Sequence, residues 1–210
     1  MKRYSSRRHR LDTQFLIEKL KGAVSYDRIA GYFCSSIMEV AGESLEKVEG
    51  KVRVICNSSL SPEDIAVADH AQKMKQEWGE FSPEEKYSSP ESGKRLSSLN
   101  HLLRSGKLEI RVIPDRIYGL MHGKAGVITY ADGSKTSFLG SINETKSAFT
   151  LNYEMLWEDD SEEAANWVQE EFDYFWNSQY AVPLADIVVK DIERISKRVV
   201  IGLEDWKENS

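Results

Sequence analysis

Apolar residues recur first at helical and then at strand spacing along the early part of the chain. Within residues 11–20, Leu16 and Leu20 lie four positions apart, and Phe15 and Ile17 widen the apolar face. A stripe of this period is typical of an amphipathic helix that rests one face on a core. We therefore predict a first helix over residues 11–20.

Runs rich in β-branched and aromatic residues predict strands at residues 26–33, 51–57 and 108–113. A helix that ends near Val48 separates the first two runs. Because a strand, helix, strand order is connected by a right-handed crossover, we expect the first two strands to be parallel neighbours.

Helix and loop signals fill the space between these strands and follow them. Ser61-Pro62 combines an N-cap with a proline at the first helical position, which predicts a helix over residues 61–78. Residues 81–93 are rich in Ser, Pro, Glu and Lys and predict a loop. We expect a further helix at residues 94–105 and a second loop at residues 114–119.

A helix rich in aromatic residues is predicted at residues 162–176, with Ser161 as its N-cap. We place its large apolar residues on one face: Trp167, Val168, Phe172, Phe175 and Trp176. Such rings could stack on nucleic-acid bases, but their helical spacing favours packing against a sheet. A weaker helix pattern covers residues 184–198.

Together these elements predict an α/β protein in which a mixed, largely parallel sheet carries helices on both faces. A chain of 210 residues is long enough for one substantial domain. We expect a basic arm at residues 1–10, a catalytic body at residues 11–180 and a C-terminal helical extension at residues 181–210.

The charge of the chain is unevenly distributed. The formal net charge is −6, yet residues 1–10 hold five basic side chains and no acidic one, so the rest of the chain carries −11. We expect Arg7, Arg8 and Arg10 to bind the phosphates of a nucleic acid. The alternative is a disordered terminus that only adds solubility.

Composition and cysteine content indicate a cytoplasmic protein. The sequence is 40% hydrophobic and 30% charged, and it contains no apolar run long enough to cross a bilayer. Its N-terminus lacks the apolar segment of a secretory signal. Cys34 and Cys56 form neither a disulfide framework nor a zinc spacing, which favours a reducing compartment.

A predicted β-hairpin carries the residues with the most distinctive chemistry. The pair Asp132-Gly133 lies between β-rich runs at residues 120–130 and 135–139 and predicts the turn. In an extended strand, His122 and Lys124 point to the same face, about 6 to 7 Å apart. The sequence therefore places an imidazole beside an ammonium group.

The second strand of the hairpin returns Gly140-Ser141-Ile142-Asn143 alongside this pair. An imidazole, an ammonium, a hydroxyl and an amide then converge, and such a group suits a phosphodiester. Arg116 in the preceding loop is either a second phosphate contact or a solvated loop arginine. A lone histidine is more often structural, and Gly140–Asn143 could be only a turn with an N-cap.

The order His-x-Lys, hairpin, Gly-Ser-x-Asn resembles the HKD half-motif of the phospholipase D superfamily. In that superfamily the His is the nucleophile or general acid, and the Lys and Asn bind phosphate. By position these residues are His122, Lys124 and Asn143, with Ser141 close to the phosphate. A carboxylate some eleven residues after the Asn orients the superfamily's His, and Glu154 stands at that position.

The chain departs from the motif where an Asp usually follows the Lys, because Thr129 and Tyr130 stand there. The specific match covers about residues 118–177 and is similar to the PLD-like modules of certain bacterial helicases and of restriction and phage-defence nucleases. The resemblance implies a phospholipase D-like sandwich that cleaves phosphodiesters through a phosphohistidine, without a metal or another cofactor.

The resemblance also implies partners. Superfamily enzymes use one His to attack and another to protonate the leaving oxygen, and this chain holds one such motif, so we expect a homodimer. We expect the substrate to be a nucleic acid, with DNA as the first candidate. A lipid is less favoured because the sequence shows no apolar surface for a membrane. A helicase or ATPase domain or subunit is a further candidate partner. The alternatives are a non-catalytic DNA-binding module of a helicase or defence complex and a phospholipase-type phosphodiesterase.

Overall fold

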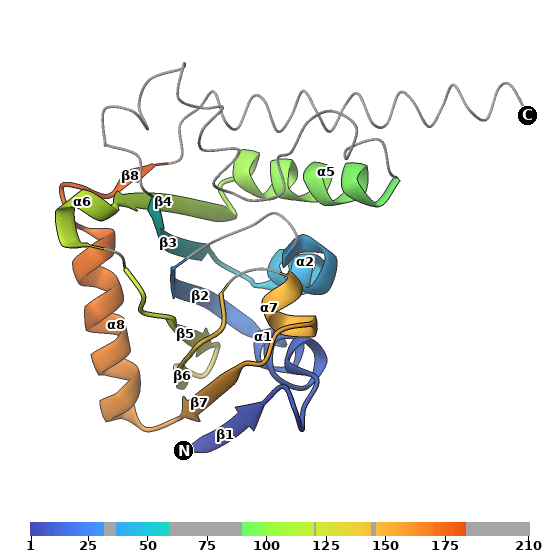
Figure 1. The fold of residues 1–210 in the computed structure, drawn as a ribbon, viewed down its shortest axis with the longest axis horizontal. Coiled ribbons are helices and arrows are strands. Elements are labelled where there is room, and N and C mark those ends of the chain that lie inside the picture. Colours follow the sequence, from blue (N-terminus) through green and yellow to red (C-terminus); the bar gives the residue numbers. More distant parts are fainter. Residues whose placement is uncertain (32–36, 59–89, 120, 144–145, 184–210) are drawn as a thin grey trace, which may run out of the picture.

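The computed structural model describes residues 1–31, 37–58, 90–119, 121–143 and 146–183. Figure 1 shows these residues as coloured ribbons. The helices expected at residues 61–78 and 184–198 and the side chain of Cys34 lie outside the described residues.

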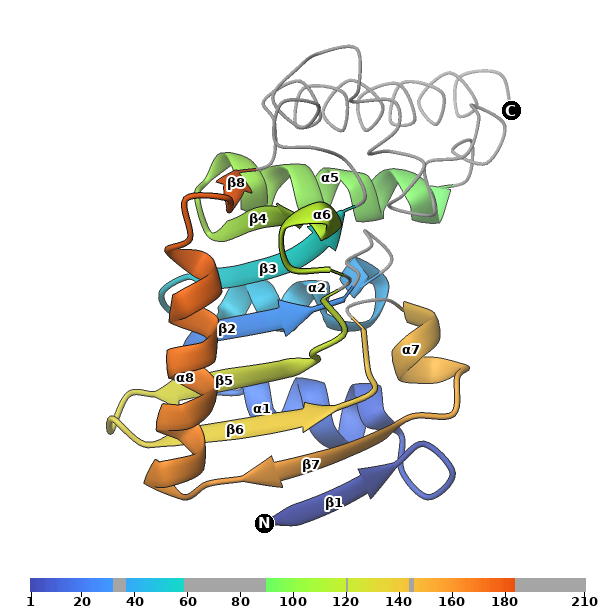
Figure 2. The same cartoon turned by 60° about the vertical axis from the view of Figure 1, so that its left-hand side comes forward.

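Eight strands form one sheet in the order β1-β7-β6-β5-β2-β3-β4-β8 (Figure 2). The strands are β1 (Lys2–Ser5), β2 (Ala23–Ala30), β3 (Val52–Ser58), β4 (Leu108–Pro114), β5 (Ala125–Tyr130), β6 (Lys135–Gly140), β7 (Met155–Asp159) and β8 (Val182–Pro183). The predicted mixed α/β sheet is confirmed.

The expected parallel majority is wrong. Parallel pairing joins β2 to β3 and β3 to β4, whereas the other described strand pairs are antiparallel. The physical reason is the connection: α2 links β2 to β3 as a crossover, but β5 and β6 are joined by a tight hairpin, which forces opposite directions.

Helices cover both faces of the sheet, as predicted. They are the π-helix η1 (Asp12–Ile17), α1 (Glu18–Leu20), α2 (Ile37–Lys47), α5 (Pro90–Arg104), α6 (Asp115–Tyr118), α7 (Lys146–Thr150) and α8 (Glu162–Trp176). Figure 1 shows α8 on one side of the sheet and α1, α2, α5 and α7 on the other. The loop expected at residues 114–119 is wrong in part, because α6 lies within it.

The larger core fills the space between the sheet and the helices opposite α8. The rings of Phe15 and Phe138 meet there at a centroid distance of 5.0 Å, and both side chains are buried. On the other face, a smaller cluster packs under α8 and includes Ile29, Met121 and Phe172. The sheet therefore has an apolar layer on each side.

The buried face of α8 differs from the predicted one at a single residue. Ser161 caps the helix by accepting a hydrogen bond from the Ala164 amide, as expected. Val168 and Phe172 are buried at a spacing of four, whereas Trp167 is 55% exposed. Trp167 lies one position away from the buried row and is therefore rotated toward solvent.

Residues 1–10 begin with a strand rather than a free arm. β1 pairs antiparallel with β7, from Lys2 opposite Glu158 to Ser5 opposite Met155. The disordered terminus that we considered is therefore wrong, because this segment supplies an edge strand of the sheet. The division of the chain at residue 180 stays a prediction.

Among the described residues, no helix combines the length and the apolar character needed to pass through a bilayer. Cys56 is buried, and its thiol donates a 3.8 Å hydrogen bond to the Arg111 carbonyl. The cytoplasmic location stays a prediction.

Candidate functional site

The ends of β2, β5, β6 and β7 lie side by side at one end of the sheet (Figure 2). Ile29 pairs with Ala125, Ala125 with Leu139, and Gly140 with Leu156. Because neighbouring strands run in opposite directions there, the residues just beyond these ends gather in one place. They are Gly31, Lys124, Ser141 and Glu154.

His122 and Lys124 immediately precede β5, whereas we expected both to lie within the strand. The sheet still fixes Lys124, because the Gly140 amide donates a 2.9 Å hydrogen bond to its carbonyl. The Lys124 ammonium donates to the His122 carbonyl at 2.8 Å, and its Nζ lies 3.5 Å from His122 Nδ1. The predicted neighbouring imidazole and ammonium are thus present, with His122 exposed and Lys124 half-buried.

Gly31 is the point on which Lys124 and Asn143 converge. A Cβ at this position would lie 2.8 Å from Lys124 Nζ, 3.3 Å from Asn143 Oδ1 and 3.2 Å from the Met121 carbonyl oxygen. The ammonium and the amide therefore occupy the space that any larger residue would take. Gly31 was not among the predicted site residues, although a glycine directly after a buried strand is a signal for close approach.

Burial lowers the pKa of Lys124, the positive charge of Arg28 lowers it further, and the negative charge of Glu154 opposes both. The net pKa lies below the ordinary value of lysine. Arg28 is fully buried on β2, where it donates a hydrogen bond to the Ile142 carbonyl and lies 5.0 Å from the Phe138 ring centroid. This buried cation was not among the predicted site residues, because its only local signal was a charged residue within an apolar strand.

Glu154 and Ser141 form a hydrogen-bonded pair at the same end of the sheet. The Ser141 hydroxyl donates to the Glu154 carboxylate and accepts a 3.1 Å hydrogen bond from the Met155 amide. Glu154 is 7% exposed, and its carboxylate also accepts a 3.5 Å hydrogen bond from the side-chain Nδ2 of Asn152. Among the described residues no hydrogen bond joins Glu154 to His122, so its role in orienting the imidazole stays a prediction.

The four candidate arginines differ in their surroundings. Arg7 and Arg8 are exposed in the turn after β1. Arg10 is instead bound to Asp12, with Nη2 2.7 Å from Oδ2 and Nε 3.1 Å from Oδ1. Arg116 lies on α6, and only its backbone belongs to the described part of the chain.

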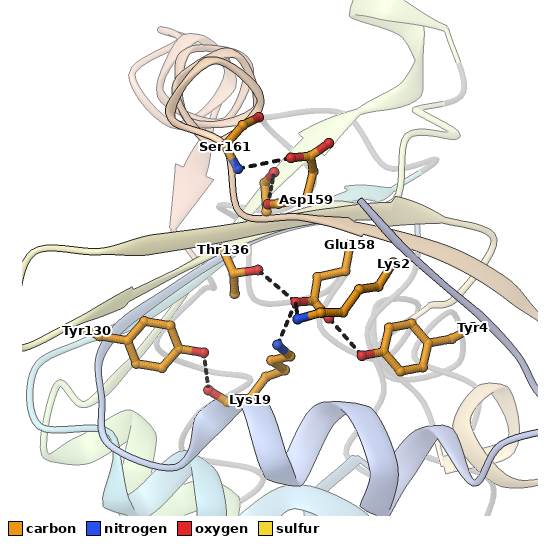
Figure 3. A network of polar contacts seen from close by, with 9 residues as sticks. Lys2, Tyr4, Lys19, Tyr130, Thr136, Glu158, Asp159 and Ser161 are labelled. Atoms are coloured by element: carbon orange, nitrogen blue, oxygen red, sulfur yellow. Dashed lines mark hydrogen bonds and ion pairs between the residues drawn. The ribbon is translucent and has the colours of Figure 1, made fainter.

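A second buried carboxylate, that of Glu158, has its own set of polar partners (Figure 3). Glu158 on β7 accepts hydrogen bonds from Lys19 at 2.5 Å, Tyr4 at 2.8 Å and Lys2 at 3.2 Å. A cavity of about 770 Å³ adjoins it and includes Gly133 of the hairpin turn. Because that turn joins the far ends of β5 and β6, the cavity is separate from the site at His122.

The arrangement around Lys124 is suited to an anion. It offers an ammonium, an amide and an exposed imidazole, with a buried guanidinium behind them. Within the described ranges, no three His, Cys, Asp or Glu side chains gather as they would around a metal ion. Whether the chemistry is independent of metal stays a prediction.

Comparison with protein families gives a match over residues 16–176 to the family described as cardiolipin synthase, PLD-like domain. Comparison with curated protein sequences gives no match.

Solved structures resemble the chain at low sequence identity. NucT from Helicobacter pylori is 19% identical, with a TM-score of 0.51 over 87% of this chain and 98% of that one. Phosphatidylserine synthase from Haemophilus influenzae Rd KW20 is 14% identical, with a TM-score of 0.50 over 94% of this chain and 43% of that one. Nuc from Salmonella typhimurium, a phospholipase D family member, is 17% identical, with a TM-score of 0.48 over 80% and 88%. The likeness to the first two is one of fold.

Proposed function

The chain belongs to the PLD-like domain family over residues 16–176, and from this membership we propose that it is a phosphodiesterase that cleaves nucleic acid through a phosphohistidine. The observation that carries the proposal is the convergence of Lys124 and Asn143 at Gly31, with His122 beside them. This arrangement supports binding of one phosphate by two donors while an imidazole faces it.

In the first step, the neutral imidazole of His122 attacks phosphorus. A phosphorus–nitrogen bond forms, and the bond from phosphorus to the leaving oxygen breaks. Lys124 and Asn143 donate to the non-bridging oxygens as negative charge grows on them. A second histidine donates its proton to the leaving oxygen and then takes a proton from water, which attacks phosphorus and releases His122.

Lys124 is half-buried, which lowers its pKa but strengthens the attraction of its ammonium for an anion. An ammonium that is partly removed from water attracts a phosphate more strongly than a solvated one does. Arg28 adds a second positive charge behind it. The pair can hold phosphate charge without a metal ion.

The second histidine is supplied by a second copy of the chain. His9, His70 and His101 are not followed by a lysine two residues later, so each chain has one His-x-Lys pair. A two-fold axis would place His122 of the partner subunit across the phosphate from the first His122. We therefore propose that the active form is a homodimer.

An exposed apolar area on the sheet supports this dimer. Leu139, Met155 and Trp157 are 42%, 43% and 37% exposed, and Leu139 is paired directly with Trp157 across β6 and β7. The expectation from the sequence that no apolar surface is present is therefore wrong for this part of the sheet. Because Met155 follows Glu154, the area adjoins the site, and a second copy seated there would bring the two sites close together.

Nucleic acid is the substrate class that the basic residues 1–10 support, since phosphate contacts dominate binding to DNA and RNA. DNA cleavage in restriction or phage defence is the role that we propose, because the His-x-Lys and Gly-Ser-x-Asn residues resemble those of PLD-like nuclease modules in such systems.

The test is incubation of the protein with single- and double-stranded DNA in excess EDTA. Cleavage in EDTA and an acid-labile phosphoprotein support the proposal. Full loss of cleavage in EDTA that Mg²⁺ restores would refute the metal-independent mechanism. DNA binding without cleavage would support a non-catalytic module instead.

Two substitutions test the roles of the basic residues. Lys124→Ala should lower the cleavage rate by about 10² to 10³, because it removes charge stabilisation in the transition state. His122→Ala should lower it further and abolish the phosphoprotein, because it removes the nucleophile. Phosphoprotein formation with His122→Ala would contradict the assignment. Thermal unfolding of both variants checks that the fold is kept.

A further inference from the structure

The turn after β1 lies directly against the candidate site. The Glu154 amide donates a 2.9 Å hydrogen bond to the Ser6 hydroxyl, and the Ser6 amide donates a 3.0 Å hydrogen bond to the Glu154 carbonyl. The Glu154 carboxylate accepts a hydrogen bond from Ser141 in the site. Arg7 and Arg8 directly follow Ser6. Their Cα atoms therefore lie within about 7 Å of the Ser6 Cα.

The turn is held in one conformation by its own hydrogen bonds. The Ser5 carbonyl accepts from the Arg8 amide at 2.8 Å and from the His9 amide at 2.9 Å. The Arg7 amide donates to the Ser5 hydroxyl at 3.3 Å. The His9 ring packs edge-on against Tyr4, with 5.4 Å between centroids. A turn that is already ordered presents its side chains to a ligand at a lower entropic cost.

The basic residues near the N-terminus divide into two kinds. Lys2 and Arg10 are neutralised by the buried carboxylates of Glu158 and Asp12. Arg3, Arg7 and Arg8 are exposed, and none of them forms an ion pair with any residue that the structure describes. Their charge is therefore available to a ligand, whereas that of Arg10, which we had expected to bind nucleic acid too, is engaged within the protein.

We infer that the turn from Ser6 to His9 is a phosphate-binding element that holds the nucleic-acid backbone beside the cleaved phosphodiester, an inference that rests on the proposed function. Each guanidinium can donate two parallel hydrogen bonds to a phosphate. Such contacts position the strand without reading its sequence. The substrate strand then runs from the Lys124 and Asn143 side of the site past Glu154 to the turn.

The experiment compares a substrate that has flanking phosphates with one that has none. The double variant Arg7→Gln/Arg8→Gln is assayed on a single-stranded oligonucleotide and on bis(p-nitrophenyl) phosphate. We expect the KM for the oligonucleotide to rise on the order of tenfold, since two phosphate contacts are lost. Hydrolysis of the small diester should stay within about twofold of wild type, because that substrate cannot reach the turn.

Binding is measured separately by fluorescence anisotropy in the inactive His122→Ala background. Loss of two phosphate contacts should reduce the slope of log affinity against log salt by about 1.4 for a single strand. An unchanged slope and an unchanged affinity would overturn the inference. Binding that weakens as expected, in a protein that cleaves neither the oligonucleotide nor the small diester, would keep the turn and refute the proposed reaction.

A control for net charge removes two positive charges elsewhere, from lysines that pair with Glu18 and Glu43. Lys21 and Lys47 are exposed and precede β2 and β3, so they lie at the end of the sheet opposite Gly31, about 25 Å away along β2. Lys21→Gln/Lys47→Gln should change oligonucleotide affinity by less than about twofold. An equal loss in this control would show a general effect of net charge and would overturn the assignment to the turn.

Discussion

At the scale of single residues, the site depends on Gly31, which has no side chain, as much as on the side chains of Lys124 and Asn143. Gly31 leaves room for the Lys124 ammonium and the Asn143 amide at the end of β2. The ammonium is the far end of a flexible side chain, so it can move away from an added methyl group at little cost to the fold. A substitution at Gly31 should therefore displace the positive charge of Lys124 without greatly lowering the stability of the protein.

Gly31→Ala should lower activity by about 10² while leaving the thermal unfolding temperature within a few degrees of wild type. The added Cβ would lie 2.8 Å from Lys124 Nζ and would displace it, and a misplacement of about 1 Å can cost this much in rate. Steady-state kinetics and thermal unfolding measure the two effects.

Gly123→Ala provides the comparison, because a Cβ there would meet only Ile29 Cγ2, at 3.8 Å. We expect it to lose much less activity than Gly31→Ala. Equal losses in the two variants would show that backbone conformation, rather than the space at Gly31, controls the site.

At the scale of elements, one carboxylate joins β1, β7 and α1. Glu158 receives Lys2 and Tyr4 from β1 and Lys19 from α1 (Figure 3). Burial raises its pKa, but the hydrogen bonds from Lys19, Tyr4 and Lys2 outweigh burial and bring the pKa below its ordinary value. Burial, and then the hydrogen bond to Glu158 and the negative charge of Glu158, raise the pKa of Tyr4 to about 12.

Glu158→Gln should lower the free energy of unfolding at pH 7 by about 3 kcal/mol, because it leaves two lysines without their buried partner. The folded pKa lies below the ordinary value of 4.5, so the stabilising contribution is complete above pH 4.5 and is lost as pH falls toward the folded pKa. The difference between wild type and variant should therefore shrink at pH 3. Urea unfolding at both pH values measures it.

Glu18→Gln is the control at the surface. Glu18 pairs with Lys21, and their side chains are 54% and 64% exposed, so this change should cost less than about 1 kcal/mol. A Glu158→Gln variant no less stable than Glu18→Gln would show that the network does not hold β1 in place.

At the scale of the whole molecule, α8 covers part of one sheet face and leaves apolar residues on β6 and β7 exposed. Trp157→Glu should convert the proposed dimer to a monomer and abolish cleavage. The introduced carboxylate would lose its hydration shell when two copies associate through this area. Light scattering at micromolar concentration and the DNA assay give the two readouts.

Tyr180→Glu is the matched control, since Tyr180 is also 37% exposed and lies beyond the end of α8. It should keep both the dimer and the activity. A wild-type protein that is monomeric and active would refute the dimer. A dimer unaffected by Trp157→Glu, with binding to anionic vesicles lost, would assign the apolar area to a lipid surface.

The sequence by itself determined the features that depend on residues close together in the chain. Asp132-Gly133 specified the hairpin, Ser161 the start of α8, and the crossover through α2 the parallel pairing of β2 with β3. The hairpin also sufficed to bring the His-x-Lys segment beside Gly-Ser-x-Asn. These features follow from turn geometry, capping and crossover handedness, which act over short separations.

Only the tertiary structure decided the features that join distant segments. The pairing of β1 with β7 turned an expected arm into an edge strand and placed Ser6, at the start of the turn that carries Arg7 and Arg8, against Glu154. The close approach of Gly31 to Lys124 likewise depends on β2 and β5 becoming neighbours. No local pattern encodes such contacts, because the free energy of pairing two strands depends on which faces the whole sheet can bury, and that is set once all the strands have assembled.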